Sequence, residues 1–140
     1  MPQFKLFHRA SQKYLATGPA LVNNTGPLIG TDLFSAGIWT MSLASGGILE
    51  TYITTTVDDI TVDIEKSTDD PVIINGISST QTNVRNQIYA LNPVLFNTFV
   101  LNGAGYLRTD DSQSLTIAFY NNRWQAYLVP ETVEWDFLPV

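Results

Sequence analysis

The chain has no cysteine and a single histidine, His8, among its 140 residues. Disulfide bonds and thiolate metal sites are therefore excluded, and packing and hydrogen bonds must hold the fold together. A catalytic triad would have only His8 to work with, and no serine lies in a nucleophile-elbow motif. The sequence also lacks metal-ligand clusters, calcium-loop patterns and phosphate-binding glycine loops. We expect a protein that is not an enzyme and needs neither metal nor cofactor, with His8 in a structural role.

Charged side chains are scarce, since they make up 14% of the residues against about 25% in ordinary globular chains. Lys and Arg together number 7 and the formal net charge is −6, which argues against a surface that follows nucleic-acid phosphates. The polar surface must be built mainly from Thr, Ser, Asn and Gln. Sugar-binding surfaces use such neutral groups, although Thr is also common in β proteins because it suits strands.

Long apolar runs are missing too. No segment approaches the roughly 20 apolar residues of a membrane-spanning helix, and the N-terminus shows no basic segment followed by an apolar one. We therefore expect no membrane insertion and a cytoplasmic location. The length fits a single domain, residues 1–140, that buries its own core.

Helical periodicity is absent, because Gly, Pro, Asn and Asp interrupt the sequence every few residues. Short alternating segments are found instead, such as 4–8 and 14–17, which together predict a β-hairpin. The pair Asn121-Asn122 predicts a tight turn because Asn tolerates positive φ. Asp58-Asp59 is expected to supply another turn. The fold class is therefore expected to be all-β.

Internal similarity suggests three units. An aromatic residue before an apolar closing strand recurs at Trp39, Tyr89 and Trp135, at intervals of 50 and 46 residues. Segment 96–109 also matches segment 4–17 without gaps at an offset of 92 residues, which is twice 46. This match pairs the aromatic residues of the two segments, placing Phe99 on Phe7 and Tyr106 on Tyr14.

Three units of about 46 residues, covering 1–46, 47–94 and 95–140, would supply four strands each. Twelve strands in three units predict a β-trefoil, in which a six-stranded barrel is capped by three hairpins and no sheet edge is left exposed. A β-sandwich is the structural alternative, but it leaves the threefold pattern unexplained. In the trefoil, Trp39, Tyr89 and Trp135 are expected to lie in the core.

Units that open like Phe-x-Leu-x-His and Lys-Tyr-Leu, and that close on Trp or Tyr before an apolar strand, resemble the β-trefoil superfamily. The acidic, cysteine-free chain is most similar to small ricin-B-like lectins of fungal fruiting bodies. The ricin-type Gln-x-Trp signature is not intact, because Gly37 and Val133 occupy two of the Gln positions and Gln87 is followed by Tyr89 in place of Trp. The resemblance implies a lectin for galactose or N-acetylgalactosamine. Fruiting-body trefoil proteins also include protease inhibitors, which keeps a second function open.

A sugar site needs a ring on which the apolar face of the sugar can stack, with neutral or anionic hydrogen-bonding groups around it. Segment 119–124 offers both within one turn, although a purely structural hairpin is the alternative. Asp110 and Asp111 follow the second strand of a unit, where the resemblance places the sugar-binding acid; solvated turns are the alternative for these acids. The candidate carbohydrate-binding residues are Asp110, Asp111, Tyr120, Asn122, Arg123, Trp124, Asn23, Asn24, Asp32, Asp69 and Asn75.

These observations predict a non-enzymatic lectin whose partners are glycans and not nucleic acids. Up to three weak sites would act together, and a homodimer would add further valency. The alternative is a protease inhibitor that inserts an exposed loop into a protease, with loop 78–85 and its Arg85 as the candidate. A third class, a scaffold or cytokine-like binder, stays open, and the acidic charge disfavours its heparin-binding form.

Overall fold

The computed structural model describes residues 2–43 and 47–140, and within these ranges the chain forms fourteen β-strands and no helix. The all-β expectation is therefore confirmed. The predicted boundary between the first two units, at residue 46, lies outside the described residues. The strands are β1 (Gln3–His8), β2 (Lys13–Thr17), β3 (Thr25–Thr31), β4 (Trp39–Thr40), β5 (Ile48–Tyr52), β6 (Thr54–Val57), β7 (Ile60–Lys66), β8 (Val72–Ile74), β9 (Ile77–Asn86), β10 (Leu95–Leu101), β11 (Ala104–Arg108), β12 (Ser114–Tyr120), β13 (Arg123–Val129) and β14 (Trp135–Pro139).

Tight turns join many of these strands, and their residues adopt the left-handed backbone that such turns require. Asn121 and Asn122 have φ of 52° and 60°, and Asp58 and Asp59 have φ of 50° and 63°. Positive φ at both central residues is the mark of the hairpin turn whose twist matches that of its strands. Both turn predictions are confirmed.

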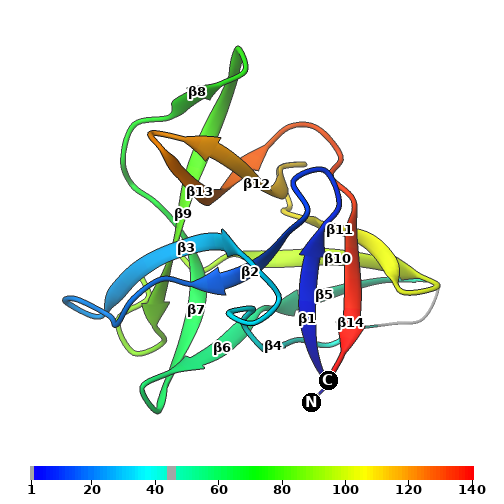
Figure 1. Cartoon of the computed structure of the whole chain (residues 1–140), viewed down its shortest axis with the longest axis horizontal. Helices are drawn as coiled ribbons and strands as arrows, with labels where there is room; N and C mark the ends of the chain where they lie inside the picture. Colours follow the sequence, from blue (N-terminus) through cyan, green and yellow to red (C-terminus); the bar gives the residue numbers. More distant parts are fainter. Residues whose placement is uncertain (1, 44–46) are drawn as a thin grey trace.

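The strands close into a ten-stranded antiparallel barrel. Hydrogen-bonded pairing leads from β1 through β14, β11, β12, β13, β3, β9, β7, β6 and β4 and returns to β1. The two ends of the chain meet because β1 pairs with β14, with Phe4 opposite Pro139 (Figure 1). The β8–β9 hairpin projects from the rest of the ribbon at the top of Figure 1.

The predicted twelve-stranded trefoil is wrong, and so is the sandwich alternative. The trefoil prediction required a six-stranded barrel capped by three hairpins. In the structure ten strands form the closed ring, in which β3 and β13 pair with each other and with β9. Similarity between units can show that a pattern repeats, but it does not say which strands pair across the units.

Two of the three aromatic residues expected in the core are there. Trp39 and Trp135 are completely buried, and their indole N–H groups donate to the carbonyl oxygens of Leu15 and Leu115 at 3.0 and 2.9 Å. Tyr89 is 51% exposed, in a turn where its backbone N–H donates to Asn86, so its core placement was wrong. A few residues further on, Val94 is buried, and its backbone N–H donates to the carbonyl oxygen of Ile64.

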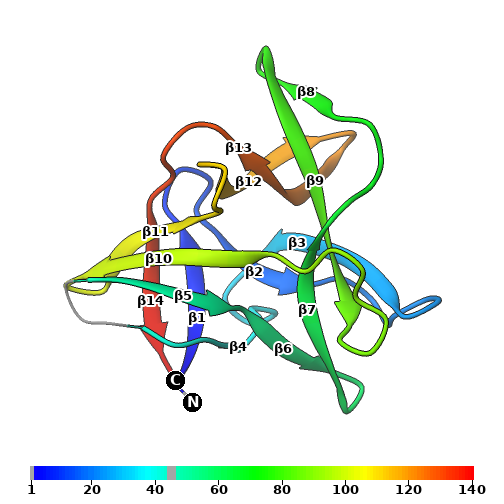
Figure 2. The ribbon, with the colours of Figure 1, turned by 180° about the vertical axis from the view of Figure 1, so that it is seen from behind.

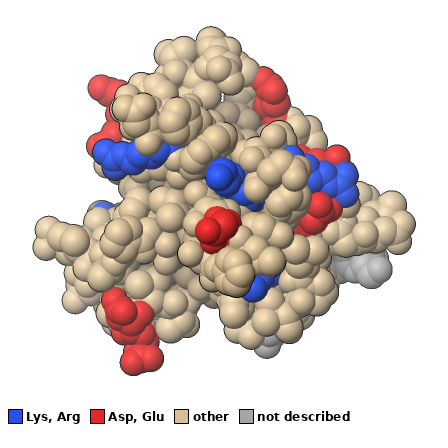
Figure 3. Space-filling model, viewed as in Figure 1, with Lys and Arg blue, Asp and Glu red and all other residues tan. Residues whose placement is uncertain are grey.

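The surface carries few charges, as the composition requires. On the face seen in Figure 3, Lys, Arg, Asp and Glu form small separate groups on a largely uncharged surface. Among the described residues no helix is long and apolar enough to cross a membrane.

Candidate functional site

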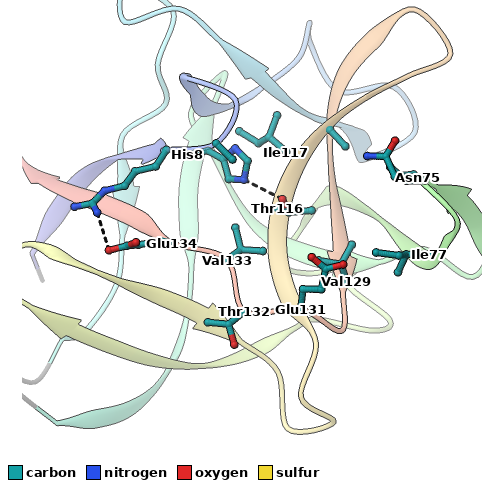
Figure 4. Close-up of a pocket in the computed structure, with 14 residues that line it drawn as sticks. His8, Asn75, Ile77, Thr116, Ile117, Val129, Glu131, Thr132, Val133 and Glu134 are labelled. Atoms are coloured by element: carbon teal, nitrogen blue, oxygen red, sulfur yellow. Dashed lines mark hydrogen bonds and ion pairs between the residues drawn. The ribbon is translucent and has the colours of Figure 1, made fainter.

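A cleft of about 710 Å³ lies beside the β8–β9 hairpin, with β12 and the segment between β13 and β14 contributing the other walls (Figure 4). Its walls are largely aliphatic and include Ile74, Ile77, Ile117, Val129 and Val133. Apart from the imidazole of His8, its lining side chains carry no aromatic ring. A cleft of this kind suits an apolar group better than the stacked ring of a sugar.

His8 is 2% exposed at the floor of this cleft and its ring is fully engaged. Its Nδ1 accepts from the backbone N–H of Ser11 at 3.2 Å. The proton must then lie on Nε2, which donates to Thr116 Oγ1 at 2.9 Å (Figure 4). The ring also packs edge-on against Trp135. Both nitrogens are occupied, so the imidazole is neither a free base nor a free metal ligand.

Burial lowers the pKa of His8 from its ordinary 6.5 to about 4, which predicts a pH-dependent stability. Between these values the unfolded chain binds more protons at His8 than the folded chain, so acidification favours unfolding. The contribution of His8 should be constant above pH 7 and fall by up to about 3 kcal/mol as the pH is lowered to 4. Urea unfolding of the native protein and of His8→Gln at several pH values from 7 to 4 measures the contribution of His8. The carboxylates titrate in both proteins, so the difference in stability between them isolates the histidine. A stability difference that stays constant with pH would contradict this assignment.

The rim of the cleft holds charges that are already paired. Arg9 binds Glu134 at 2.7 Å and Asp136 at 2.7 Å. These carboxylates raise the pKa of the Arg9 side chain, chiefly because the guanidinium donates hydrogen bonds to Asp136. The arrangement ties the β1–β2 turn to β14, so these charges have a structural role.

A second surface combines aromatic and polar groups. The antiparallel strands β5, β10 and β11 run side by side across the view of Figure 2. Their outward side chains form what we call the β10 face. It consists of Ile48, Glu50, Tyr52, Leu95, Asn97, Phe99, Leu101, Tyr106 and Arg108.

The first row of the β10 face is an aromatic platform. Phe99 lies opposite Tyr106 on one side and opposite Ile48 on the other. The Phe99 and Tyr106 rings stack with centroids 5.5 Å apart and planes 21° from parallel. They line a pocket of about 440 Å³ whose other wall includes Thr132 and Glu134. A hydroxyl and a carboxylate thus lie beside a partly buried ring pair.

The second row is polar, and two of its side chains, Asn97 and Arg108, are held by hydrogen bonds. Asn97 lies between Glu50 and Arg108 in cross-strand register. The Asn97 amide donates to Asp110 Oδ1 at 3.1 Å. Arg108 donates to Thr132 Oγ1 at 2.6 Å, while its guanidinium lies 5.9 Å from the centre of the Tyr106 ring. Such fixed side chains lose little rotamer freedom when they bind a ligand.

Gly105 allows β11 to lie closely against β10. A Cβ at this position would come within 1.6 Å of the Phe99 carbonyl oxygen, a backbone atom that cannot move independently. Gly105 therefore maintains the strand spacing on which the stacked pair depends.

The sequence identified part of this surface without recognising it as a site. The offset match that aligned Phe99 with Phe7 and Tyr106 with Tyr14 is confirmed, because each is a cross-strand pair in its hairpin. The rings of Phe7 and Tyr14 lie 4.9 Å apart. The contributions of Glu50 and Asn97 were missed, since their register joins strands about fifty residues apart.

Of the predicted acids, Asp110 borders the β10 face through its bond with Asn97. Asp111 accepts a hydrogen bond from Thr109, which lowers the pKa of its carboxyl group, and forms an ion pair with Lys66 at 3.6 Å. Both acids line a polar pocket of about 290 Å³ that also contains Leu95, at the opposite end of β10 from the aromatic platform.

The hairpin that was the strongest sequence candidate has clear structural roles. Trp124 packs against Phe119 with ring centroids 5.2 Å apart, and Lys13 lies 5.3 Å from its ring centre. Tyr120 meets Tyr127 edge-on. Asn122 holds the left-handed turn, and Arg123 is exposed at the start of β13. The sugar-binding role of these residues stays a prediction.

The remaining candidates are dispersed. Asn23 and Asn24 form a left-handed turn, Asp32 caps the backbone N–H of Ser35 at 3.0 Å, Asp69 lines a small hollow, and Asn75 reaches the large cleft from the β8–β9 turn (Figure 4). The predicted residues therefore do not converge on three equivalent sites.

The loop expected to insert into a protease is not a loop. Segment 78–85 belongs to the ten-residue strand β9. Its Arg85 is engaged with Glu65, with Nε 2.5 Å from Oε2. The protease-inhibitor alternative therefore no longer has the exposed loop on which it was based.

The comparisons add no family assignment. Within the described residues no group of three or more His, Cys, Asp or Glu side chains could hold a metal ion. No protein-family model matches the chain, and a search of curated proteins also finds no match. The resemblance to ricin-B-like lectins stays a prediction that these comparisons do not support.

Proposed function

We propose that the protein is a non-enzymatic lectin that binds carbohydrate on the β10 face. The observation that supports this most directly is the stacked pair of Phe99 and Tyr106 beside the polar row of Glu50, Asn97 and Arg108. A pyranose ring has an apolar C–H face and a rim of hydroxyl groups. The aromatic platform matches the first, and the polar row matches the second.

Each polar group has a defined part in this proposal. The carboxylate of Glu50 accepts hydrogen bonds from sugar hydroxyl groups, and the Arg108 guanidinium donates to hydroxyl oxygens. Asp110 holds the Asn97 amide and so positions it. The sugar class suggested by the resemblance, galactose or N-acetylgalactosamine, is the first to be tested. Affinity per site is expected to be weak because one sugar ring covers little surface.

Tyr106→Ala should weaken sugar binding at least about tenfold, equivalent to about 1.4 kcal/mol. The substitution removes half of the stacking platform and the ring that faces Arg108. Calorimetric titration with galactose and N-acetylgalactosamine measures the loss, and thermal unfolding checks that the variant is folded. Tyr106→Phe, which keeps the ring, should bind within about threefold of the native protein.

The matched control is Tyr14→Ala, because Tyr14 faces Phe7 in the equivalent position of the first hairpin. It removes the same side chain from the same kind of cross-strand pair while leaving the β10 face unchanged. Equal losses in the two variants, or no loss in Tyr106→Ala, would place the site elsewhere. Native protein that binds neither these sugars nor any glycan on an array would refute the proposal.

A further inference from the structure

The β10 face extends beyond the aromatic platform. Along β10 the outward side chains are Leu101, Phe99, Asn97 and Leu95, and the last of these lies opposite Tyr52 of β5. Tyr52 is 50% exposed. The face thus has aromatic residues on both sides of the polar row.

The length of the face exceeds one sugar ring. Phe99 and Leu95 are four residues apart on one strand, which at about 3.4 Å per residue separates their Cα atoms by about 13–14 Å. Each end borders a separate hollow, because Phe99 lines the 440 Å³ pocket and Leu95 lines the 290 Å³ pocket with Asp110. A single pyranose cannot contact both ends.

Hydrogen-bonding side chains in the middle of the β10 face lie between the two hollows and contact residues of each. Asn97 lies between the Phe99 and Leu95 rows, and its amide donates to Asp110, which lines the second hollow. Arg108 lies opposite Asn97 and is held by Thr132, which lines the first hollow. Hydrogen-bonding groups therefore continue between the two aromatic ends without a break in the strand register.

We infer that the β10 face is one elongated site for a linear oligosaccharide of at least three units. One terminal ring stacks on Phe99 and Tyr106, the middle ring lies over the polar row, and the third ring stacks on Tyr52. The inference rests on the proposed lectin function and deepens it, because it names a chain and not a monosaccharide as the ligand. The uncharged outer rings of such a chain suit a face whose ends are aromatic.

The experiment compares a monosaccharide with its linear trisaccharide, using the sugar that the array identifies. In calorimetry the trisaccharide should bind the native protein at least tenfold more tightly. Tyr52→Ala should reduce its affinity to that of the monosaccharide, while monosaccharide affinity changes less than twofold. Tyr89→Ala is the matched control, because Tyr89 is equally exposed, at 51%, but lies in a turn outside the face. It should change neither affinity.

The outcomes separate the two proposals. Trisaccharide affinity equal to that of the monosaccharide would overturn the elongated site and leave the lectin proposal intact. A Tyr52→Ala variant that binds the trisaccharide with the affinity of the native protein would also overturn the elongated site and leave the lectin proposal intact. If the native protein binds no glycan on the array, the lectin function fails, and the elongated site fails with it.

Discussion

Replacing Trp135 by alanine should lower the free energy of unfolding by about 3–5 kcal/mol, the range for large-to-small changes of an aromatic side chain in a packed core. Trp135 is completely buried, and it begins β14, which pairs with both β1 and β11. The lost indole also leaves the Leu115 carbonyl without its donor. Urea unfolding at pH 7 measures the change.

Trp124→Ala provides the comparison for Trp135→Ala. Trp124 is half-buried on the β12–β13 hairpin and packs against Phe119 and Lys13. Its replacement removes the same number of atoms from a site that solvent can reach, so the loss of stability should be clearly smaller. A Trp135→Ala variant that loses less than about 1 kcal/mol, or no more than Trp124→Ala, would contradict the central role of Trp135 in the core.

Local features of the fold could be predicted because short-range sterics determine them. Asn121-Asn122 and Asp58-Asp59 form turns because these residue types accept positive φ. The hairpin predicted from segments 4–8 and 14–17 is also present, with Phe7 opposite Tyr14, because the turn between two neighbouring strands determines how they pair. Each of these predictions used only a short stretch of sequence.

Pairing between distant strands could not be predicted in this way. The contact of Ile48 with Phe99, and that of β3 with β9 and β13, join segments far apart in the sequence. Many alternative registers satisfy the same alternation of apolar and polar residues. The threefold pattern selected a trefoil because it treated Tyr89 as equivalent to Trp39 and Trp135. The exposure of Tyr89 shows that this equivalence fails in the middle unit.

The same limit applies to the candidate site. Sequence reasoning favoured segment 119–124 because its rings and amides are neighbours in the chain. The β10 face brings together Glu50, Asn97 and Arg108 from three strands, so no short sequence motif indicates it. Asp110 was the predicted residue closest to it, because its position after β11 brings it beside Asn97.

The second large effect is expected from Glu65→Ala, which should cost about 3–5 kcal/mol of stability because it leaves a partly buried arginine without its partner. Glu65 is 5% exposed, and its Oε2 accepts from Arg85 at 2.5 Å. Its Oε1 accepts the backbone N–H groups of Leu91 and Asn92 at 2.8 and 3.0 Å. One carboxylate therefore secures both β9 and the turn that follows it.

Two measurements distinguish the ion pair from the backbone contacts. Glu65→Leu combined with Arg85→Leu should recover much of the stability lost in Glu65→Ala, because no unpaired charge remains. The Leu91 and Asn92 amides should still exchange faster with solvent in the double variant, since neither leucine offers an acceptor. Glu131→Ala, at an exposed carboxylate, is the control and should change stability by less than about 0.5 kcal/mol.

The pKa of Asp63 gives a further measurement of the effect of Glu65→Ala. Burial raises the pKa of the Asp63 carboxyl, and the negative charge of Glu65 raises it further. Removing Glu65 takes away that repulsion, so the pKa of Asp63 should fall in Glu65→Ala, which NMR titration of the carboxyl carbon can follow. A carboxyl group whose pKa is raised on folding loses its stabilising contribution as the pH rises from the unfolded value of 3.8 through the folded value, so this loss should be smaller in Glu65→Ala than in the native protein. Unchanged amide exchange at Leu91 and Asn92, together with an unchanged Asp63 titration, would show that Glu65 does not couple β7 to the turn after β9.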